Sequence, residues 1–320
     1  MSREHIDHKH IVDFADRTVN LHRDDAKEYR EQVGRLREKL EKYVAENHDF
    51  ELRKILLSGS LAKHTALRTI NDIDVAVYIE SAPDDVRQLT KWLAKKLRTA
   101  FPNFSPDQVQ GQTYSVRIDF RGSGLSVDVV PVFSEGREAD GDWGYLVSQE
   151  DGRPLRTNIT LHKEFIRKRR KSNQHYAQVV RLLKWWVRTR KQENGQFGFK
   201  SFMVELVLAK LIDNGASLDD YPEAVLSFFD YIARTNFSDM IAFSDYPDAG
   251  TPTDCDDPIR VFDPVNAQNN VGQKYSDNQR NVIVDECVDA GDAVEAALKA
   301  PTKELTVRYW QKVFGSSFRV

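Results

Sequence analysis

The sequence predicts an α+β fold, in which a half built on a mixed β-sheet is followed by a helical half, with a cleft between them. Segments that read as strands gather in the first half, at residues 72–79, 114–120 and 125–132. Apolar side chains alternate with polar ones in the first two segments, as on a strand with one exposed face, and the third segment is nearly all apolar. From about residue 161 the apolar residues recur at steps of three and four, which is typical of helices. We expect a core domain at residues 1–160, whose N-terminal helix packs toward the helical half, and a helical domain at 161–320.

The first half carries further element signals. Residues 24–46 and 84–101 each place apolar side chains along one stripe, and Pro102 ends the second helix. Gly122-Ser123-Gly124 reads as a hairpin turn between the last two strands. Residues 134–157 are rich in Gly, Asp and Glu, so we expect an extended loop there.

The second half predicts a series of helices with one irregular interruption. The expected helices cover residues 173–192, 201–213, 221–232, 278–298 and 302–314, and residues 244–267 read as irregular. Within the apolar 201–213 helix, Glu205 is expected to be a buried, paired carboxylate. At the other end of the chain, His5, His8 and His10 could form a metal site, but a frayed polar terminus is favoured.

Composition excludes several classes of protein. The chain has 320 residues, 40% of them hydrophobic and 30% charged, and a net charge of −3, without the basic excess of an indiscriminate nucleic-acid binder. Two cysteines make neither a disulfide framework nor a zinc pattern, and they fit a reducing cytoplasm. No run approaches the ~20 apolar residues of a membrane span, and the N-terminus lacks the core of a signal peptide. We therefore expect a cytoplasmic protein without a membrane partner.

Asp72 and Asp74 form the most informative motif of the chain. They alternate with Ile73 and Val75, so both carboxylates point to the same face of a strand, roughly 6.5 Å apart along it. Carboxylates that close repel unless a positive charge lies between them, and Mg²⁺ prefers carboxylate oxygen. A solvated strand face is the alternative interpretation of these two residues alone.

Gly59-Ser60 precedes the two aspartates by about a dozen residues. Glycine allows the backbone to approach a ligand closely. Backbone N–H groups at a turn or helix start, with a hydroxyl beside them, suit a phosphate. The sequence thus places a candidate phosphate cradle just before a candidate metal pair.

A third carboxylate is available from either of two strands. Asp119 lies on a polar face beside Arg117, which favours a structural role. Asp128 is embedded in the apolar run 125–132, where a carboxylate is costly unless it is paired or binds a metal. Because Asp128 has no obvious neighbouring cation and no wet face in the sequence, it is the predicted third ligand.

Gly59-Ser60, Asp72-x-Asp74 and Asp128 together resemble the pattern of DNA polymerase β-like nucleotidyltransferases. The whole chain further resembles the cGAS/DncV-like nucleotidyltransferases (CD-NTases) of bacterial CBASS anti-phage systems. It looks most similar to the clade encoded beside HORMA-domain proteins and AAA+ ATPase remodellers. The segments that carry this match are residues 58–63, 71–78, 101–109, 200–203 and 309–318.

This resemblance implies a polymerase β-like core, a C-terminal helical domain similar to that of oligoadenylate synthases, and an active site in the cleft. The implied activity is synthesis of a cyclic oligonucleotide second messenger from ATP with release of pyrophosphate. The product would be adenine-based, with cyclic tri-AMP as one candidate. Two Mg²⁺ ions, for which Mn²⁺ can substitute, would be bridged by Asp72 and Asp74, and Asp128 would contact the catalytic ion.

The resemblance also implies nucleotide-binding residues. Gly59 and Ser60 would hold the donor phosphates, Lys184 would contact the triphosphate, and Ser201 would lie against the donor nucleotide. From the sequence alone, Lys184 could equally snorkel past neighbouring Trp rings, and Ser201 reads as a helix N-cap. The acceptor-side candidates, by pattern, are Gln112, Thr113 and Tyr114.

The partners implied by the resemblance are ATP, a HORMA-domain activator and an AAA+ ATPase regulator. The strongest basic run is residues 163–171, which contain Lys-Arg-Arg-Lys at 168–171. It is either a solvated face or a patch for nucleotide entry or for nucleic acid such as double-stranded DNA. Two rival functions remain. A template-independent RNA or tRNA-end nucleotidyltransferase would use the same three carboxylates, and a nucleotide-binding scaffold would have no catalytic activity. Base choice, linkage and ring size do not follow from the sequence.

Overall fold

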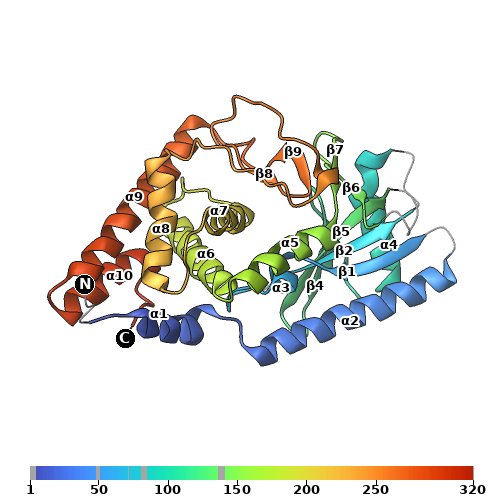
Figure 1. The fold of residues 1–320 in the computed structure, drawn as a ribbon. Helices are drawn as coiled ribbons and strands as arrows, with labels where there is room; N and C mark the ends of the chain where they lie inside the picture. The colour runs from blue at the N-terminus through green and yellow to red at the C-terminus, as the bar shows by residue number, and fades with distance from the viewer. Residues whose placement is uncertain (1–4, 48–50, 71, 81–84, 136–140, 320) are drawn as a thin grey trace. The chain divides into compact units, whose positions relative to one another are not determined.

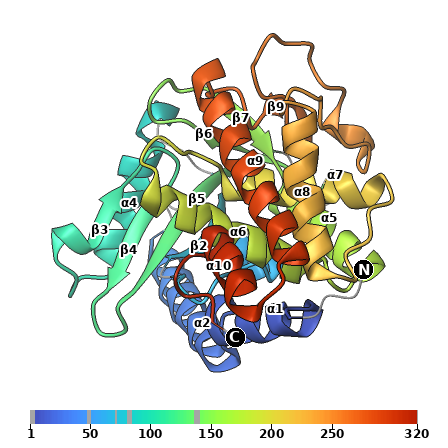
Figure 2. The same cartoon turned by 90° about the vertical axis from the view of Figure 1, so that its left-hand side faces the viewer.

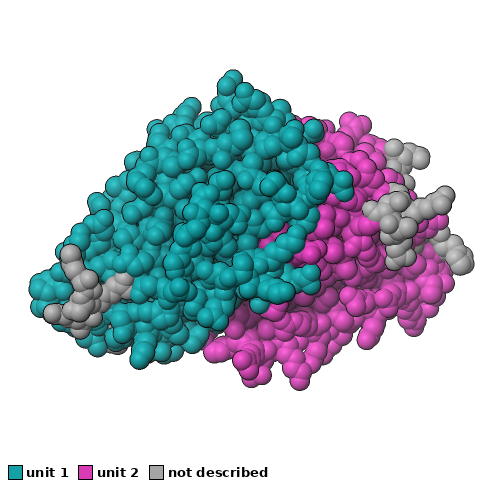
Figure 3. All heavy atoms as spheres, in the orientation of Figure 1, with its two compact units in different colours: residues 1–20, 167–320 teal, residues 21–166 magenta. Residues whose placement is uncertain are grey.

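The computed structural model describes residues 5–47, 51–70, 72–80, 85–135 and 141–319. The chain forms two compact units, which Figure 3 colours separately. Unit 1 comprises residues 1–20 and 167–320, and unit 2 comprises residues 21–166. These units are not identical with the expected domains 1–160 and 161–320, because the first twenty residues group with the C-terminal ones. Residues 1–4, 71 and 84, which entered the sequence interpretation, lie outside the described residues.

Unit 2 is built on a mixed sheet, as the sequence predicts. Its strands are ordered β1-β2-β5-β4-β3, with β2 and β5 parallel and the other pairs antiparallel. Their bounds are Leu52–Leu57 for β1, Asp72–Ile79 for β2, Val109–Gly111 for β3, Val116–Phe120 for β4 and Leu125–Ser134 for β5. The predicted hairpin joins β4 to β5.

The expected loop at residues 134–157 is wrong in part. It contains β6 (Gly144–Val147) and β7 (Pro154–Thr157), and β6 pairs with the end of β5. Each strand has only four residues, too few for a side-chain alternation to stand out from Gly, Asp and Glu around it. These strands form because the end of β5 offers them backbone hydrogen bonds.

Helices α2 (Arg23–Glu46) and α4 (Leu89–Ala100) cover the apolar face of this sheet, and Figure 1 shows α2 running along it. Leu36 and Leu40 of α2 and Leu93 of α4 belong to the same buried cluster as the sheet residues Ile73, Val75, Val127 and Val129. The predicted helix at 84–101 is confirmed for α4, which a short 3₁₀ turn, η2 (Val86–Gln88), precedes. Another 3₁₀ turn, η3 (Pro106–Gln108), leads into β3.

The opposite face of the sheet changes character along β2 and β5. Ala76, Tyr78 and Val132 form a small buried cluster there, with Leu146 packed against it. Toward the start of β2 the same face carries aspartates instead. The chemistry-bearing side chains therefore gather at one end of this face, next to the five-residue helix α3 (Gly59–Lys63).

Unit 1 is helical, and the predicted helices are confirmed within a few residues at each end. They are α6 (Tyr176–Glu193), α7 (Ser201–Asp213), α8 (Tyr221–Arg234), α9 (Asp277–Lys299) and α10 (Lys303–Phe314), and α5 (Ile159–Ser172) leads into the unit. Helices α8 and α9 lie side by side (Figure 2), and α9 also packs on α10. The irregular stretch between α8 and α9 holds a 3₁₀ turn, η5 (Pro247–Ala249), and the small strand pair β8 (Phe262–Asp263) and β9 (Asn266–Asn270).

The expectation of a frayed N-terminus is wrong for the described residues from His8 onward. Residues His8–Phe14 form helix α1, which continues into the π-helical turn η1 (Ala15–Val19) and packs against α8. Asp7 and His10 close its start as a capping box, and His8 Nδ1 accepts a hydrogen bond from the Tyr221 backbone N–H at 3.2 Å. Because Phe14 is fully buried in unit 1, apolar packing holds this segment in place.

Among the described residues, no helix combines the length and the apolar character needed to cross a membrane.

Candidate active site

The strand register brings Asp72, Asp74 and Asp128 onto one face of unit 2. In the parallel pair of β2 and β5, Asp74 lies beside Asp128 and Asp72 beside Ser126. Residues paired across neighbouring strands point to the same side of a sheet. Their neighbours Ile73, Val75 and Val127 are fully buried on the other side. We call the surface formed by Asp72, Asp74, Asp128 and their β4 neighbours Arg117 and Asp119 the aspartate face.

Gly59 approaches this face more closely than any other residue type could. It has a φ of +60°, and a Cβ built on it would overlap the Asp74 carboxylate. The Ser58 backbone N–H donates a hydrogen bond to the Asp74 carbonyl at 2.9 Å, which ties the start of α3 to β2. The Gly59-Ser60 turn therefore lies against the aspartate face, and its approach to a phosphate stays a prediction. Ser60, the second residue of α3, is half-buried.

Arg117 supplies a cation to the aspartate face, and the expectation that Asp128 lacks a neighbouring cation is wrong. In the β4–β5 pair, Arg117 lies directly opposite Asp128. Its Nη2 is 2.9 Å from Asp72 Oδ1, and its Nε is 2.9 Å from Asp119 Oδ1. Counting back along both strands from the Gly122-Ser123-Gly124 turn gives this register, so the sequence held a signal for it.

Asp119 has the structural role that the sequence predicts. Ser126 Oγ donates to Asp119 Oδ1 at 2.5 Å, and Arg117 Nη2 donates to Ser126 Oγ at 2.7 Å. The hydrogen bond from Ser126, followed by the one from Arg117, lowers the pKa of the Asp119 carboxyl. Asp119 and Ser126 therefore fix the position of the Arg117 guanidinium.

Asp128 Oδ1 is buried without a hydrogen-bond partner. Asp72 Oδ1 is too, but it lies 2.9 Å from Arg117 Nη2. Burial, followed by the charge of Asp72, raises the pKa of Asp128, while Arg117 partly offsets this increase. A half-buried carboxylate with an unmet oxygen would gain from a cation placed beside it.

The aspartate face fits a hard divalent cation in the kind of donor that it offers. Three carboxylates share the face, Asp128 Oδ1 has no partner, and Gly59 leaves room at Asp74 only because it lacks a side chain. The side chains do not converge as ligands, however, since no group of three or more His, Cys, Asp or Glu in the described ranges could hold a metal ion as placed. Arg117 holds the Asp72 carboxylate instead. The three-ligand site stays a prediction.

Lys184 forms a buried ion pair in unit 1. Its Nζ lies 2.5 Å from Glu205 Oε1, and the two side chains are only 7% and 3% exposed. The prediction for Glu205 is confirmed, and the interpretation of Lys184 as snorkelling to water is wrong because its ammonium group is buried. A contact of Lys184 with a triphosphate stays a prediction.

Ser201 is the first residue of α7 rather than its N-cap, which is Lys200. The expectation of an N-cap is therefore wrong by one residue, within the usual uncertainty of a helix boundary. Ser201 is exposed at the start of α7. Its contact with a donor nucleotide stays a prediction.

The acceptor-side candidates lie in the loop between β3 and β4. Ser115 Oγ donates to Gln112 Oε1 at 2.7 Å, and Thr113 Oγ1 donates to Glu150 Oε1 at 3.1 Å. Tyr114, between them, is 38% exposed. These contacts shape the loop, and the role of the loop toward an acceptor stays a prediction.

The basic run at residues 168–171 is not uniformly a solvated face. Arg169 is buried in unit 1, where it binds Asp213 at 2.5 Å and Asp245 at 2.9 Å. Lys168 lies over the Tyr246 ring. Arg169 is therefore part of the structure of unit 1, which leaves fewer charges for a nucleic-acid patch than the sequence suggests.

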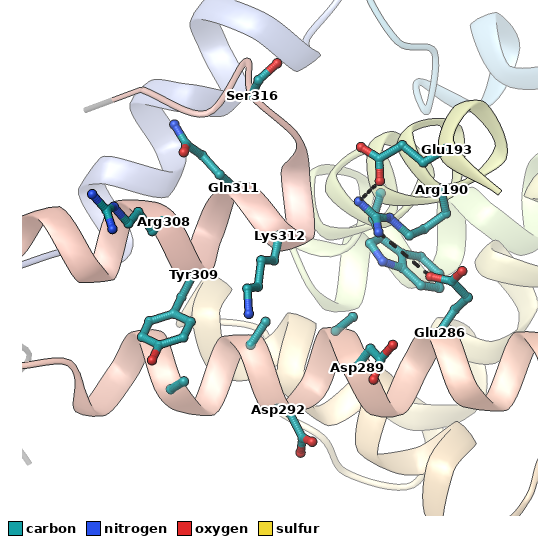
Figure 4. Close-up of a pocket in the computed structure, with 14 residues that line it drawn as sticks. Arg190, Glu193, Glu286, Asp289, Asp292, Arg308, Tyr309, Gln311, Lys312 and Ser316 are labelled. Atoms are coloured by element: carbon teal, nitrogen blue, oxygen red, sulfur yellow. Dashed lines mark ion pairs between the residues drawn. The ribbon is translucent and has the colours of Figure 1, made fainter.

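A cavity of about 800 Å³ opens elsewhere in unit 1, between α6, α9 and α10 (Figure 4). Arg190, Glu193, Glu286 and Asp289 line it, and Arg190 forms ion pairs with Glu193 and Glu286. None of the predicted site residues lines this cavity. Its charges largely balance one another, so we assign it no role in the chemistry.

Comparisons with known proteins identify the family to which the chain is similar. Residues 7–169, just over half of the chain, match the model of the Second Messenger Oligonucleotide or Dinucleotide Synthetase domain. A cyclic AMP-AMP-AMP synthase of Escherichia coli strain MS 115-1 is 54% identical over 323 residues, which cover all of both chains.

Solved structures give the same result. The structure of E. coli MS115-1 CdnC with ATP matches with a TM-score of 0.90 and 53% identity over 99% of this chain and 100% of that one. CdnC in complex with a HORMA protein matches equally, with a TM-score of 0.90 and 52% identity over all of both chains. The chain therefore belongs to the family of Second Messenger Oligonucleotide or Dinucleotide Synthetases, nucleotidyltransferases that include the CBASS oligonucleotide cyclases.

Proposed function

We propose that this chain joins ATP molecules into a cyclic oligonucleotide and releases pyrophosphate at each step. The observation that carries the proposal is the placement of Asp72, Asp74 and Asp128 on one face, with Gly59 packed against Asp74. The 54% identical relative is named a cyclic AMP-AMP-AMP synthase, and we propose the same product, cyclic tri-AMP, for this chain.

In the proposed mechanism, Asp72, Asp74 and Asp128 would hold the Mg²⁺ ions. Bound Mg²⁺, or Mn²⁺ in its place, would activate the attacking hydroxyl group and offset the charge on the leaving pyrophosphate. Asp128, a half-buried carboxylate on the same face, would accept the proton of the attacking hydroxyl. Asp128 would keep this proton while the new phosphodiester bond forms, the bond between the α- and β-phosphates breaks and pyrophosphate leaves.

The donor phosphates would bind at the start of α3. There the Gly59 backbone comes close without a side chain, and the Ser60 hydroxyl stands next to it. Lys184 and Ser201 are proposed as further contacts to the donor, and Gln112 and Thr113 as contacts to the acceptor. For Lys184 this contact would compete with its ion pair to Glu205.

The proposed setting is cytoplasmic anti-phage defence with a HORMA-domain partner. A HORMA protein is bound to a 52% identical relative in a solved structure, which supports this partner. Both cysteines, Cys255 and Cys287, are free, which fits a reducing compartment. An AAA+ ATPase that remodels the HORMA protein and double-stranded DNA as a further activator remain predictions.

The test is to incubate the purified full-length chain with Mg²⁺ and all four NTPs, with and without its HORMA partner and with added RNA. We expect a phosphatase-resistant product with the mass of cyclic tri-AMP, which mass spectrometry identifies. Asp74→Asn should abolish the product, while Asp107→Asn, which changes an exposed carboxylate paired with Arg121, should not.

Two results would favour the rival functions. Label that appears only on the added RNA would indicate an RNA-end nucleotidyltransferase. Full protection of cells against phage by the Asp72→Asn, Asp74→Asn double variant would indicate a scaffold without catalytic activity.

A further inference from the structure

The Asp72 carboxylate already has a cationic partner in the protein itself. Arg117 Nη2 lies 2.9 Å from Asp72 Oδ1, but Asp72 Oδ1 receives no well-aligned hydrogen bond. The same Nη2 donates a directed hydrogen bond to Ser126 Oγ at 2.7 Å. Arg117 and Asp72 therefore form a close ion pair without a hydrogen bond, and the hydrogen bonds of the guanidinium go to Asp119 and Ser126.

Arg117 is anchored independently of Asp72. Its Nε donates to Asp119 Oδ1 at 2.9 Å, and Ser126 bridges its Nη2 to the same carboxylate oxygen. This small network lies on β4 and β5 and involves neither Asp72 nor Asp74. Asp72 could consequently leave the ion pair while Arg117 stays in place.

The position of Arg117 also affects the second carboxylate. Arg117 lies opposite Asp128 across the β4–β5 pair, and its charge acts on both Asp72 and Asp128. The side chain is 29% exposed, so its charge is only partly screened by water. Without a cation, carboxylates this close would repel one another.

We propose that Arg117 is an internal counter-ion that holds the Asp72 carboxylate in the absence of divalent cation and that a binding cation must displace. This proposal rests on the proposed function, in which Asp72, Asp74 and Asp128 bind Mg²⁺. Asp72 exchanges the guanidinium for the metal ion and turns toward Asp74 and Asp128. Arg117 keeps its hydrogen bonds to Asp119 and Ser126, and its positive charge continues to repel the metal ion.

Two measurable consequences follow. Arg117 stabilises the cation-free fold, because it offsets the repulsion between Asp72 and Asp128. It also weakens the binding of divalent cations, because it competes for Asp72 and carries the same sign of charge as the metal ion. Arg117 is thus a positioning residue, which sets the cation concentration at which the site fills.

The experiment measures Mn²⁺ affinity from the paramagnetic resonance signal of free Mn²⁺, without nucleotide, together with the unfolding temperature of the same samples. We expect Arg117→Gln to bind Mn²⁺ about 3- to 10-fold more tightly than the unmodified chain, as expected for loss of a competing ion pair. Its unfolding temperature should be lower without cation and should rise more when Mn²⁺ is added.

Two further variants serve as controls. Arg117→Lys keeps the charge, so its Mn²⁺ affinity should stay close to that of the unmodified chain. Arg121→Gln removes an exposed arginine that is paired with Asp107 near the same hairpin, and it should change neither affinity nor stability. The tests distinguish an effect of Arg117 on the site from a general effect of lost positive charge.

Equal or weaker Mn²⁺ binding by Arg117→Gln would overturn the proposal, since a merely structural arginine would lower stability without raising affinity. If the single variant Asp128→Asn binds Mn²⁺ as tightly as the unmodified chain, Asp128 is not a metal ligand, and the proposed mechanism fails. Tighter binding by Arg117→Gln that Asp128→Asn abolishes supports both.

Discussion

The aspartate face of unit 2 and the buried Lys184–Glu205 pair of unit 1 solve the same electrostatic problem in different ways. In unit 1, one ammonium group meets one carboxylate at 2.5 Å, and both side chains are almost fully buried. On the aspartate face, one guanidinium stands among Asp72, Asp119 and Asp128, and an oxygen of Asp128 has no hydrogen-bond partner. The Lys184–Glu205 pair is therefore electrostatically complete, whereas the aspartate face can take up a further cation.

The balance of charge explains this difference. A buried pair of opposite charges is stable only when both partners are present, because either charge alone is costly to bury. An excess of carboxylates around one arginine is tolerated because the face is partly open to water, with the Asp72 and Asp119 side chains about 40% exposed. The excess negative charge is then available to a ligand, as expected for a functional site.

Removing one partner of the closed pair should have the largest effect. Lys184→Met leaves Glu205 buried without its ammonium partner, and we expect a loss of about 3–5 kcal/mol in the free energy of unfolding. Urea denaturation measures this loss. Lys184→Met combined with Glu205→Leu should recover most of it, since neither charge is then buried. A Lys184→Met variant with unchanged stability and reduced affinity for ATP would show instead that Lys184 is mainly a phosphate ligand.

Adding a side chain at Gly59 should disturb the aspartate face, with a smaller effect on the free energy of unfolding. The Cβ of Gly59→Ala would displace the Asp74 carboxylate, and we expect product formation to fall about 10²-fold, as for a catalytic group misplaced by about 1 Å. Gly124→Ala is the matched control, since Gly124 also has a positive φ, of +69°, but has nothing near its Cβ position. Similar loss of activity in both variants would mean that backbone strain, and not the contact with Asp74, is responsible.

Removing the charge of Asp119, which anchors Arg117, should have the smallest effect on stability, and this effect should depend on pH. The pKa of Asp119 is lower in the folded chain than its usual value, so its ionised form stabilises the fold above the unfolded pKa of about 3.9. We expect Asp119→Asn to lower the unfolding temperature by about 1–3 °C at pH 7. The difference should disappear as pH falls through the folded pKa, below about pH 4. A difference that persists at low pH would indicate that packing, not charge, is lost.

The sequence predicted the strands and helices that show a clear periodicity. The alternation around Asp72 and Asp74 predicts their shared face, and the apolar helix at 201–213 has the predicted bounds. Strands β6 and β7 were missed because each has four residues. Helix α1 was missed because its polar histidines outweighed the buried Ile11 and Phe14, and Phe14 stacks on Phe314, which is far away in the chain.

Contacts between distant segments limited the prediction of the site. The partner of Lys184 lies on another helix, and no local pattern connects the two positions. Arg117 is different, because the register of a hairpin is fixed by its turn and places it opposite Asp128. That register alone identifies Arg117 as the cation beside Asp128.

The most direct test of the account is a crystal structure with Mn²⁺ and a non-hydrolysable ATP analogue, in which anomalous scattering locates the metal. We predict Mn²⁺ about 2.0–2.3 Å from carboxylate oxygens of Asp72, Asp74 and Asp128, as expected for divalent metal–oxygen bonds, with the Asp72–Arg117 ion pair broken and Arg117 still bound to Asp119. A metal ion bound away from these carboxylates, or an intact Asp72–Arg117 pair beside a filled site, would contradict it.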